Sequence, residues 1–180
     1  MDVAAMNHAF AESPFPDGRW GASGTLLSRA LQRFAATKVG SATIRSLVPL
    51  DRKVLIRSAG RYTVLGPFGS PMLLLTTTGR RSGLERTTPL VYLPRGDHLL
   101  VVGSNFGQST HPAWALNLEA NPMADLAIRG KHFSVVAQEL GGDERDVAWG
   151  LFATMAKPYE AYGERTTRHI KVFSLHQTTS

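Results

Sequence analysis

Residues 73–93 read LLLTTTGRRSGLERTTPLVYL, two apolar segments on either side of a short basic stretch with two glycines. Segments of this composition, separated by a glycine-containing stretch, predict two antiparallel strands, at residues 72–78 and 87–93. Pro89 indicates an edge strand or a bulge, because proline donates no backbone hydrogen bond. A simple hairpin turn does not need three arginines, so the basic stretch needs a further explanation.

The pattern of short strands continues along the rest of the chain. Four more strands are expected, at residues 98–104, 123–129, 132–140 and 169–175. Two helices are expected between them, one that ends before Pro122 and one over residues 143–156, and a short piece at residues 158–163 follows the second helix. Ser109 or Thr110 is a candidate cap for the first of these helices, and Pro112 suits its first turn. Strands do not alternate with helices as in a Rossmann domain. We therefore expect an α+β fold, mainly β, built on a closed or half-closed barrel of about six antiparallel strands.

The N-terminal part has a different pattern. Residues 1–22 contain prolines and glycines without sustained periodicity, so we expect a flexible arm followed by one domain over residues 23–180. Apolar residues recur at helical spacing over residues 25–39 and basic ones face elsewhere, which predicts an amphipathic basic helix. This helix either packs on the edge of the domain or lies on an anionic membrane surface. After Pro49 the signals become mostly β.

Length and composition narrow the class of protein. The chain has 180 residues, which suits a single domain with a substantial core. It contains no cysteine, which excludes disulfides, thiolate metal sites and a cysteine nucleophile and agrees with a reducing cytoplasm. No apolar run approaches the roughly 20 residues of a membrane span, and no basic segment of a signal peptide is expected.

The charge distribution predicts an anionic partner. The net charge is +6, and between Gly18 and Ser70 nine basic residues stand against one acid, Asp51. Nucleic acid, an anionic lipid surface or an acidic small molecule would each fit this charge. Single-stranded nucleic acid needs aromatic side chains interleaved with the basic ones. The aromatic residues here lie mostly apart from the arginines, so we expect no nucleic-acid binding.

The stretch TTTGRRSGLERTTP has the chemistry of a phosphate site. Gly79 and Gly83 allow a ligand to approach the backbone, and nearby N–H groups can donate to phosphate oxygens together with the hydroxyls of Thr78 and Ser82. The arginines, at positions 80, 81 and 86, match phosphate with two parallel hydrogen bonds each. The stretch lacks the Gly-Lys-Ser/Thr of a Walker A motif. The alternative is a solvated basic hairpin.

A second polar segment, VVGSNFGQSTHPAW, follows the third expected strand. Ser104 and Asn105 end that strand, and residues 106–108 are expected to form a flexible tip, a common place for ligand contacts. Trp114 either offers a flat face for a ring or is buried in the core. Asn117 either binds a ligand or hydrogen-bonds the helix backbone.

A third segment, MAKPYEAYGERTTRHI, places Tyr159 and Tyr162 three residues apart. On a helix they share one face, where phenols stack on a ring and donate a proton. The alternative is a pair of tyrosines half-buried at the edge of the domain.

No metal or triad pattern is visible in the sequence. The histidines are scattered and lack the spacing of metal ligands, so we expect no metal site; they are His8, His98, His111, His132, His169 and His176. No Gly-x-Ser-x-Gly elbow is present.

These three segments, in this order and at this spacing, resemble the deazaflavin-dependent nitroreductase family, F420H2-dependent quinone and nitro reductases of actinobacterial type. The resemblance extends over residues 50–175 and rests on GRRSGxxRTTPL together with HPAWxxNLxANP. It implies a split β-barrel related to FMN-binding proteins. It also implies a cytoplasmic enzyme that uses reduced coenzyme F420 to reduce a quinone, nitroaromatic or enone-type acceptor.

The resemblance also implies roles for individual residues. One group would hold the cofactor phosphate and acidic tail, namely Arg80, Arg81, Ser82, Gly83 and Arg86, beside Thr78. Another would lie along or near the deazaflavin ring, namely Thr87, Thr88, Pro89, Ser104, Asn105, Trp114 and Asn117. Tyr159 and Tyr162 would line the substrate side, and Ser104, Tyr159 and Tyr162 are the candidate catalytic residues. The cofactor carries the hydride chemistry and the protein orients it.

One departure from the family concerns the substrate. Members that activate nitroimidazoles carry a tyrosine near position 156 and a lysine near position 105, where this chain has Ala156 and Asn105. Nitroreduction is therefore left open. Alternatives for the whole chain are an FMN- or haem-binding barrel protein and a non-catalytic F420 carrier. As partners we expect a small-molecule acceptor, a second copy of the chain if it is a homodimer and not a monomer, and a cytoplasmic membrane face if the basic helix binds it.

Overall fold

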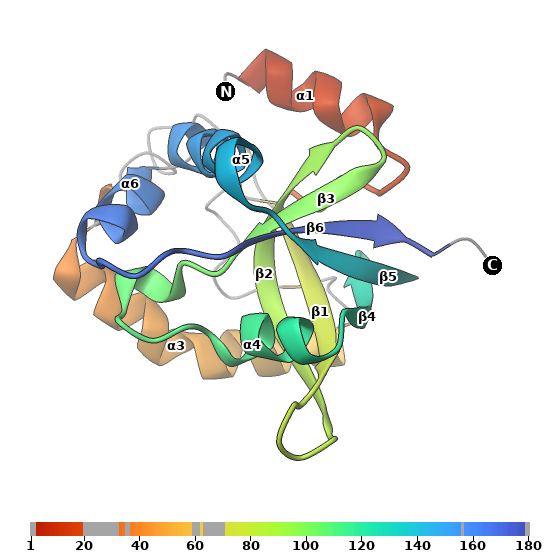
Figure 1. Ribbon diagram of the computed structural model, residues 1–180, viewed down its shortest axis with the longest axis horizontal. Coiled ribbons are helices and arrows are strands. Elements are labelled where there is room, and N and C mark those ends of the chain that lie inside the picture. Colours follow the sequence, from red (N-terminus) through yellow and green to blue (C-terminus); the bar gives the residue numbers. More distant parts are fainter. Residues whose placement is uncertain are drawn as a thin grey trace.

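The computed structural model describes residues 3–19, 33–34, 37–58, 62, 71–155 and 157–178. Its centre is a closed barrel of antiparallel strands in the order β1-β2-β3-β6-β5-β4 (Figure 1). The strands are β1 (Met72–Thr78), β2 (Glu85–Arg95), β3 (His98–Val102), β4 (Met123–Ile128), β5 (Lys131–Glu139) and β6 (Val172–Gln177). The predicted α+β class with a six-stranded antiparallel barrel is confirmed.

The alternation of side chains along β1 explains how the barrel fills. Leu73 and Leu75 face inward and belong to the main core, whereas Leu74 faces the outside. The predicted first strand agrees with β1, and β2 is longer than predicted at both ends. β3 ends at Val102, so Ser104 lies beyond the strand and not at its end.

Helices α4 (Ala113–Ala120) and α5 (Gly142–Met155) each bury side chains in the main core. The first buries Trp114, Ala115 and Leu118 in it, and the second buries Ala148 and Phe152. α6 (Lys157–Glu164) follows α5 directly. The expected side-chain cap of α4 by Ser109 or Thr110 is wrong, because the N-cap position is Pro112 and carries no side-chain hydrogen bond.

Helix α3 (Lys38–Arg57) is the main departure from the sequence prediction, since it continues through Pro49 where β signals were expected. Thr37 caps its start, and its Oγ1 accepts a hydrogen bond from the Gly40 N–H at 2.9 Å. Leu55 packs with Leu74 and Ala127 on the outside of the barrel. Burying such a leucine contributes about 1.5–3 kcal/mol, similar to the roughly 3 kcal/mol that an interior proline costs.

The described part of the N-terminal segment is not the flexible arm that its composition predicted. Residues of α1 (Val3–Glu12) and the following loop pack on the barrel, and Phe10 and Phe15 belong to the main core. The Tyr92 hydroxyl donates to the Pro16 carbonyl at 2.7 Å and accepts from the Gly18 N–H at 2.8 Å. A Cβ on Gly18 would come within 2.7 Å of the Met72 carbonyl oxygen, so the close approach requires glycine.

Most of the predicted basic helix at residues 25–39 lies outside the described residues, and its last two positions begin α3. None of the helices in the described part of the chain combines the length and the apolar character needed to cross a membrane.

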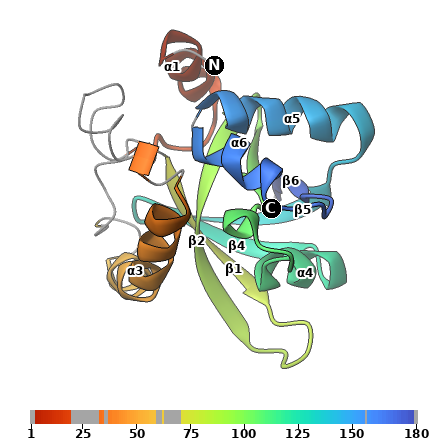
Figure 2. The same cartoon turned by 90° about the vertical axis from the view of Figure 1, so that its left-hand side faces the viewer.

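Strand β2 leaves the barrel split along one side. Its residues 85–91 pair with β1, but only residues 92–95 pair with β3. No other described strand pairs with the free edge of residues 85–91. The β1–β2 hairpin therefore extends past the body of the barrel, next to α4, as both views show (Figures 1 and 2).

Candidate functional site

The turn of the β1–β2 hairpin accounts for both of its glycines. The Gly79 N–H donates to the Leu84 carbonyl at 2.8 Å, and the Gly83 N–H donates to the Gly79 carbonyl at 2.7 Å. A Cβ on Gly79 would come within 2.8 Å of Ser82 Oγ, and Gly83 has φ +67. The turn itself therefore requires these glycines, and the predicted approach of a ligand to them is not needed to explain them.

The arginines of this hairpin are free for a ligand. Arg80, Arg81 and Arg86 are exposed. No residue in the described part of the chain forms an ion pair or side-chain hydrogen bond with them. Three like charges on one short hairpin repel one another, so an anion bound between them is stabilised by all three.

Asn117 ties the hairpin to helix α4. Its Oδ1 accepts a hydrogen bond from the Arg80 backbone N–H at 3.1 Å, and its Nδ2 donates to Thr77 Oγ1 at 3.0 Å. Asn117 is buried, so its amide is engaged with the protein itself and positions Arg80. The structure therefore favours this positioning role of Asn117 over the predicted direct contact with a cofactor ring.

Thr87, Thr88 and Pro89 are half-buried and lie on the part of β2 that pairs with β1 on one edge only. Thr87 shares a face with Thr76, with their hydroxyl oxygens 2.8 Å apart, and Thr88 points to the opposite face. Their side chains therefore cannot all line one flat ring. The free backbone edge of the strand is the feature that the three residues share.

The segment after β3 has an unusual backbone. Asn105, Phe106 and Gly107 of the short helix η2 (Asn105–Gly107) have φ of 46, 56 and 74, which is the left-handed region. Consecutive residues of this kind store strain and concentrate at functional sites. A Cβ on Gly107 would come within 2.9 Å of the Tyr162 carbonyl oxygen, so η2 packs closely on α6. The segment predicted as a flexible tip is therefore a packed turn.

Arg168 holds this segment in place. Its guanidinium donates to the Gly103 carbonyl at 2.8 Å, to the Ser104 carbonyl at 2.7 Å and to the Gln108 carbonyl at 2.9 Å. Burial lowers the pKa of Arg168, but a guanidinium keeps its charge at neutral pH. The sequence offered no signal for this residue, because its partners lie about 60 residues earlier in the chain.

The Ser104 hydroxyl is buried without a partner. The side chain is 9% exposed, and no described residue hydrogen-bonds its Oγ. A buried hydroxyl without a hydrogen bond costs about 1–3 kcal/mol, and a ligand removes that cost by accepting from it. This hydroxyl is the clearest sign of a missing ligand among the predicted residues. Asn105, in contrast, donates to the Thr110 carbonyl at 2.9 Å.

Tyr159 and Tyr162 belong to an aromatic cluster beside η2. Their ring centroids lie 5.9 Å apart; Tyr162 also contacts Phe106 edge-on, and Tyr159 contacts Trp149 and Phe152. Burial, with the neighbouring Tyr162, raises the pKa of Tyr159, so its phenol stays protonated at neutral pH. The cluster extends the predicted tyrosine pair by three aromatic residues that spacing in the sequence does not connect.

Trp114 lies in the core and not in an open site. Its ring is 5% exposed and packs edge-on against Phe173 at 5.7 Å between centroids. It therefore cannot present a face to a ring in this arrangement. Its helix still lies beside two parts of the site, because a Cβ on Gly103 would come within 3.6 Å of the Ala115 Cβ and Asn117 accepts a hydrogen bond from the Arg80 N–H.

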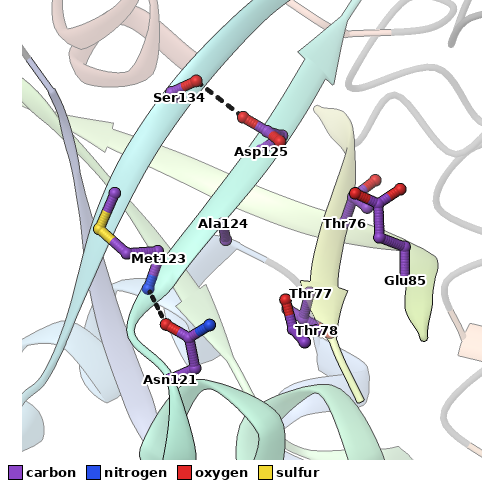
Figure 3. A pocket seen from close by; sticks show the side chains of 9 residues that line it. All are labelled: Thr76, Thr77, Thr78, Glu85, Asn121, Met123, Ala124, Asp125 and Ser134. Carbon is purple, nitrogen blue, oxygen red and sulfur yellow. Dashed lines mark hydrogen bonds between the residues drawn. The ribbon is translucent and has the colours of Figure 1, made fainter. Parts of the chain in front are cut away.

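A pocket of ≈ 180 Å³ opens beside the end of β1 (Figure 3). The charged residues that line it are Glu85 and Asp125, and Asp125 accepts a hydrogen bond from Ser134 at 2.7 Å. Two carboxylates repel a phosphate, so this pocket does not fit the anionic ligand that the hairpin arginines suit. Of the predicted residues only Thr78 lines it.

A split six-stranded barrel with an unpartnered basic hairpin and a buried free hydroxyl defines a cofactor-binding protein for an anionic cofactor. The sequence model of the F420H(2)-dependent quinone reductase family matches residues 52–177. An F420H(2)-dependent quinone reductase of Mycobacterium tuberculosis is 38% identical over 112 residues, which is 61% of this chain and 75% of that protein. The chain therefore belongs to the F420H(2)-dependent quinone reductase family.

Solved structures agree with this assignment. One described as an F420-H2 dependent reductase has a TM-score of 0.54 at 36% identity and covers 59% of this chain and 94% of that chain. Another, described as a domain-swapped dimer, has a TM-score of 0.56 at 29% identity and covers 76% of this chain and 98% of that chain. The protein is an F420H2-dependent reductase, and coenzyme F420 is its cofactor.

The described residues fit this cofactor. Coenzyme F420 carries a phosphodiester and glutamate carboxylates, which match the free arginines of the hairpin. Ser104 has a buried hydroxyl, a group that is able to donate a hydrogen bond to a ligand. Ala156, where characterised nitroimidazole activators carry tyrosine, lies outside the described residues.

Proposed function

We propose that this protein reduces a quinone-type acceptor with F420H2, binding the cofactor between the basic hairpin and the turn after β3. When bound, the reduced deazaflavin supplies a hydride to an electrophilic acceptor. The observation that carries the proposal is the hairpin with three unpaired arginines, fixed by Asn117 to the helix that also supports the Ser104 turn.

The arginines have the simplest role in this proposal. Arg80, Arg81 and Arg86 bind the phosphate and the acidic tail, and the Asn117 hydrogen bond holds the first of them at the edge of the barrel. Each charge-assisted hydrogen bond contributes about 1.5–3 kcal/mol. The flat part of the cofactor binds to the unpaired backbone groups along residues 85–91, beside Thr87, Thr88 and Pro89.

Ser104 and Tyr159 are the proposed donors near the reacting atoms. The Ser104 hydroxyl has no partner among the described residues, and the raised pKa of Tyr159 keeps its phenol neutral. Either group can polarise an acceptor oxygen, and the phenol can deliver a proton to it. Tyr162 packs between Phe106 and Tyr159 and so sets the position of the second donor.

A quinone is favoured as the acceptor by the names of the relatives and by the aromatic wall. Phe106 and Tyr159 are half-buried and present flat apolar surface, which suits a planar ring, and the buried Tyr162 packs against both. Nitroaromatic and enone-type acceptors need the same hydride and the same hydrogen-bond donor, and stay alternatives within this proposal. A homodimer is also proposed, because a relative of known structure is a domain-swapped dimer.

Oxidation of F420H2 by menadione tests the proposal directly. The purified protein is mixed with F420H2, and the return of the oxidised deazaflavin absorption is followed with and without menadione. Steady turnover that requires both protein and menadione is expected. Binding of F420 without turnover for any acceptor would indicate a carrier, and binding of FMN or haem in place of F420 would contradict the proposal.

A further inference from the structure

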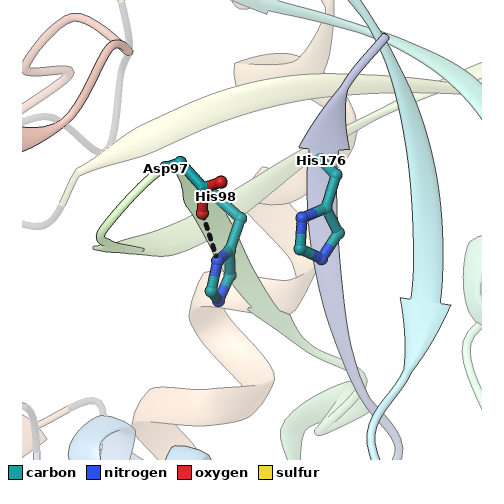
Figure 4. Close-up of side chains that lie close together, drawn as sticks. All are labelled: Asp97, His98 and His176. Carbon is teal, nitrogen blue, oxygen red and sulfur yellow. Dashed lines mark hydrogen bonds and ion pairs between the residues drawn. The ribbon is translucent and has the colours of Figure 1, made fainter.

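Two histidines that are 78 positions apart in the sequence face each other at the far end of the barrel. His98 opens β3 and His176 lies near the end of β6, and the strand register places them directly opposite. Their ring centroids are 4.7 Å apart with 31° between the ring planes. Asp97 completes the group, with its Oδ1 3.1 Å from His98 Nδ1 (Figure 4).

Two imidazoles and a carboxylate are the ligand set of zinc and related metals. The candidate ligand atoms of Asp97, His98 and His176 all lie within 4.8 Å of one another. A tetrahedral zinc with bonds of about 2.0–2.1 Å holds its ligand atoms roughly 3.3 Å apart. Small rotations of the side chains are enough to reach this spacing, because the two histidines sit on paired strands and Asp97 lies in the turn that directly precedes β3.

We propose that Asp97, His98 and His176 form a binding site for a divalent transition metal of the zinc type, separate from the cofactor site. His98 is 22% exposed and Asp97 88% exposed, so the ion reaches the site from solvent and keeps water in its open positions. Such a site gives three protein ligands and at least one exchangeable one. The sequence suggested no metal, because the two histidines are 78 positions apart and only the β3–β6 register joins them.

The site is remote from the cofactor. It follows the C-terminal end of β2, whereas the basic hairpin precedes the N-terminal end of that strand. An extended strand of this length spans roughly 33 Å. The metal therefore acts on stability: it ties the β2–β3 turn to β6 and favours the folded state in proportion to its occupancy.

Two neighbours influence the binding of a cation. Arg95 is paired with His98 in the register, so its charge lies on the same face and opposes the metal. The Oγ of Ser174 lies 3.0 Å from His176 Nε2 and orients that ring as an outer hydrogen-bond partner does in metal sites. Removing the charge of Arg95 should tighten metal binding. The test therefore includes one variant that is expected to gain metal affinity beside the variants that are expected to lose it.

The test uses untagged protein stripped with EDTA and titrated with Zn²⁺ by calorimetry and with Co²⁺ by visible absorption. One equivalent is expected to bind and to raise the thermal midpoint. His98→Gln and His176→Gln should each weaken Zn²⁺ binding at least tenfold, Asp97→Asn less, and Arg95→Gln should strengthen it. His132→Gln, an exposed histidine on β5, is the matched control and should change nothing.

The folded state of each variant is checked by its thermal midpoint without metal. If His98→Gln does not fold, the His176→Gln and Arg95→Gln variants decide the question. Zinc that fails to bind the wild-type protein in the millimolar range overturns the proposal. Binding that is equally strong in the wild type and in His176→Gln, with no gain in Arg95→Gln, overturns it as well.

Discussion

The carboxamide of Asn117 fixes the backbone of Arg80, with Oδ1 3.1 Å from the Arg80 nitrogen. The same side chain donates to Thr77 Oγ1 at 3.0 Å, so a buried residue of α4 holds both the last inward residue of β1 and the first arginine of the turn. The basic hairpin is thus preorganised relative to the helix that also packs on Gly103.

Asn117→Ala should weaken F420 binding without removing any group that touches the cofactor. The lost hydrogen bond to the Arg80 N–H is worth about 0.5–1.5 kcal/mol, so the dissociation constant should rise about two- to tenfold. Fluorescence titration with F420 measures this. Asn121→Ala, which removes a hydrogen bond from the Met123 N–H just after the C-terminal end of α4, is the control. Equal affinities in both variants would contradict the positioning role.

Arg168→Lys should damage the turn that holds Ser104 while keeping the charge. A lysine cannot reach three carbonyl groups at once, so we expect a loss of about 1.5–3 kcal/mol in the free energy of unfolding. The turnover number should fall more than the affinity for F420, because the hairpin is intact. Urea unfolding and steady-state kinetics measure both, with Lys131→Gln on β5 as a surface control. An unchanged turnover number at reduced stability would show a purely structural role.

Tyr159→Phe tests the proposed donor through pH. Because burial raises the pKa of Tyr159, its phenol is protonated in the folded protein at every pH below its ordinary value of about 10. The turnover of the wild type should therefore show no limb from Tyr159 between pH 6 and about 9. The substitution should lower turnover at all these pH values alike. A limb near neutral pH that disappears in the variant would contradict this assignment.

The same shift makes a prediction for stability. A group whose pKa is raised in the folded state favours folding below its unfolded pKa, and this contribution is lost as pH rises above it. The wild type should lose stability above about pH 10 more steeply than Tyr159→Phe does. Chemical unfolding at a series of alkaline pH values measures the difference. Tyr92, which burial shifts in the same direction, is present in both proteins and cancels.

Tyr92→Phe tests the attachment of the N-terminal segment. The substitution removes the hydrogen bond to the Pro16 carbonyl and leaves the Gly18 N–H without its acceptor, which costs about 1–3 kcal/mol. Limited proteolysis should then cut before residue 19 more quickly, while F420 affinity stays unchanged. Tyr62→Phe, at a tyrosine that is 68% exposed, is the matched control. Cleavage at the wild-type rate would indicate that the segment is held by Phe10 and Phe15 alone.

The barrel was largely predictable because its strands are short apolar segments with alternating burial, and β1 agrees with the predicted range. Helix α3 was not, because Pro49 normally ends a helix and the compensating contact of Leu55 with Leu74 is a tertiary one. The N-terminal segment was misjudged for the same reason. The burial of Phe10 and Phe15 depends on a barrel surface that comes later in the chain.

The candidate site shows the same difference between local features, which could be predicted, and long-range contacts, which could not. The arginines of the hairpin could be found from the sequence, because a local run of charge stays local in the fold. The contribution of Arg168 and the pairing of His98 with His176 depend on strand register and loop packing over long separations. A tryptophan can serve as a platform for a ring, but Trp114 packs against Phe173 in the core.

The central claim, that the hairpin arginines hold the anionic part of F420, is tested most directly by one binding measurement. Wild type and the triple variant Arg80→Gln, Arg81→Gln, Arg86→Gln are titrated with F420 and with the same deazaflavin lacking phosphate and glutamates. We predict that the variant loses F420 affinity by at least a hundredfold, because each arginine contributes about 1.5 kcal/mol or more, and that it binds the tail-less ring as the wild type does. Equal F420 affinity in both proteins would contradict it.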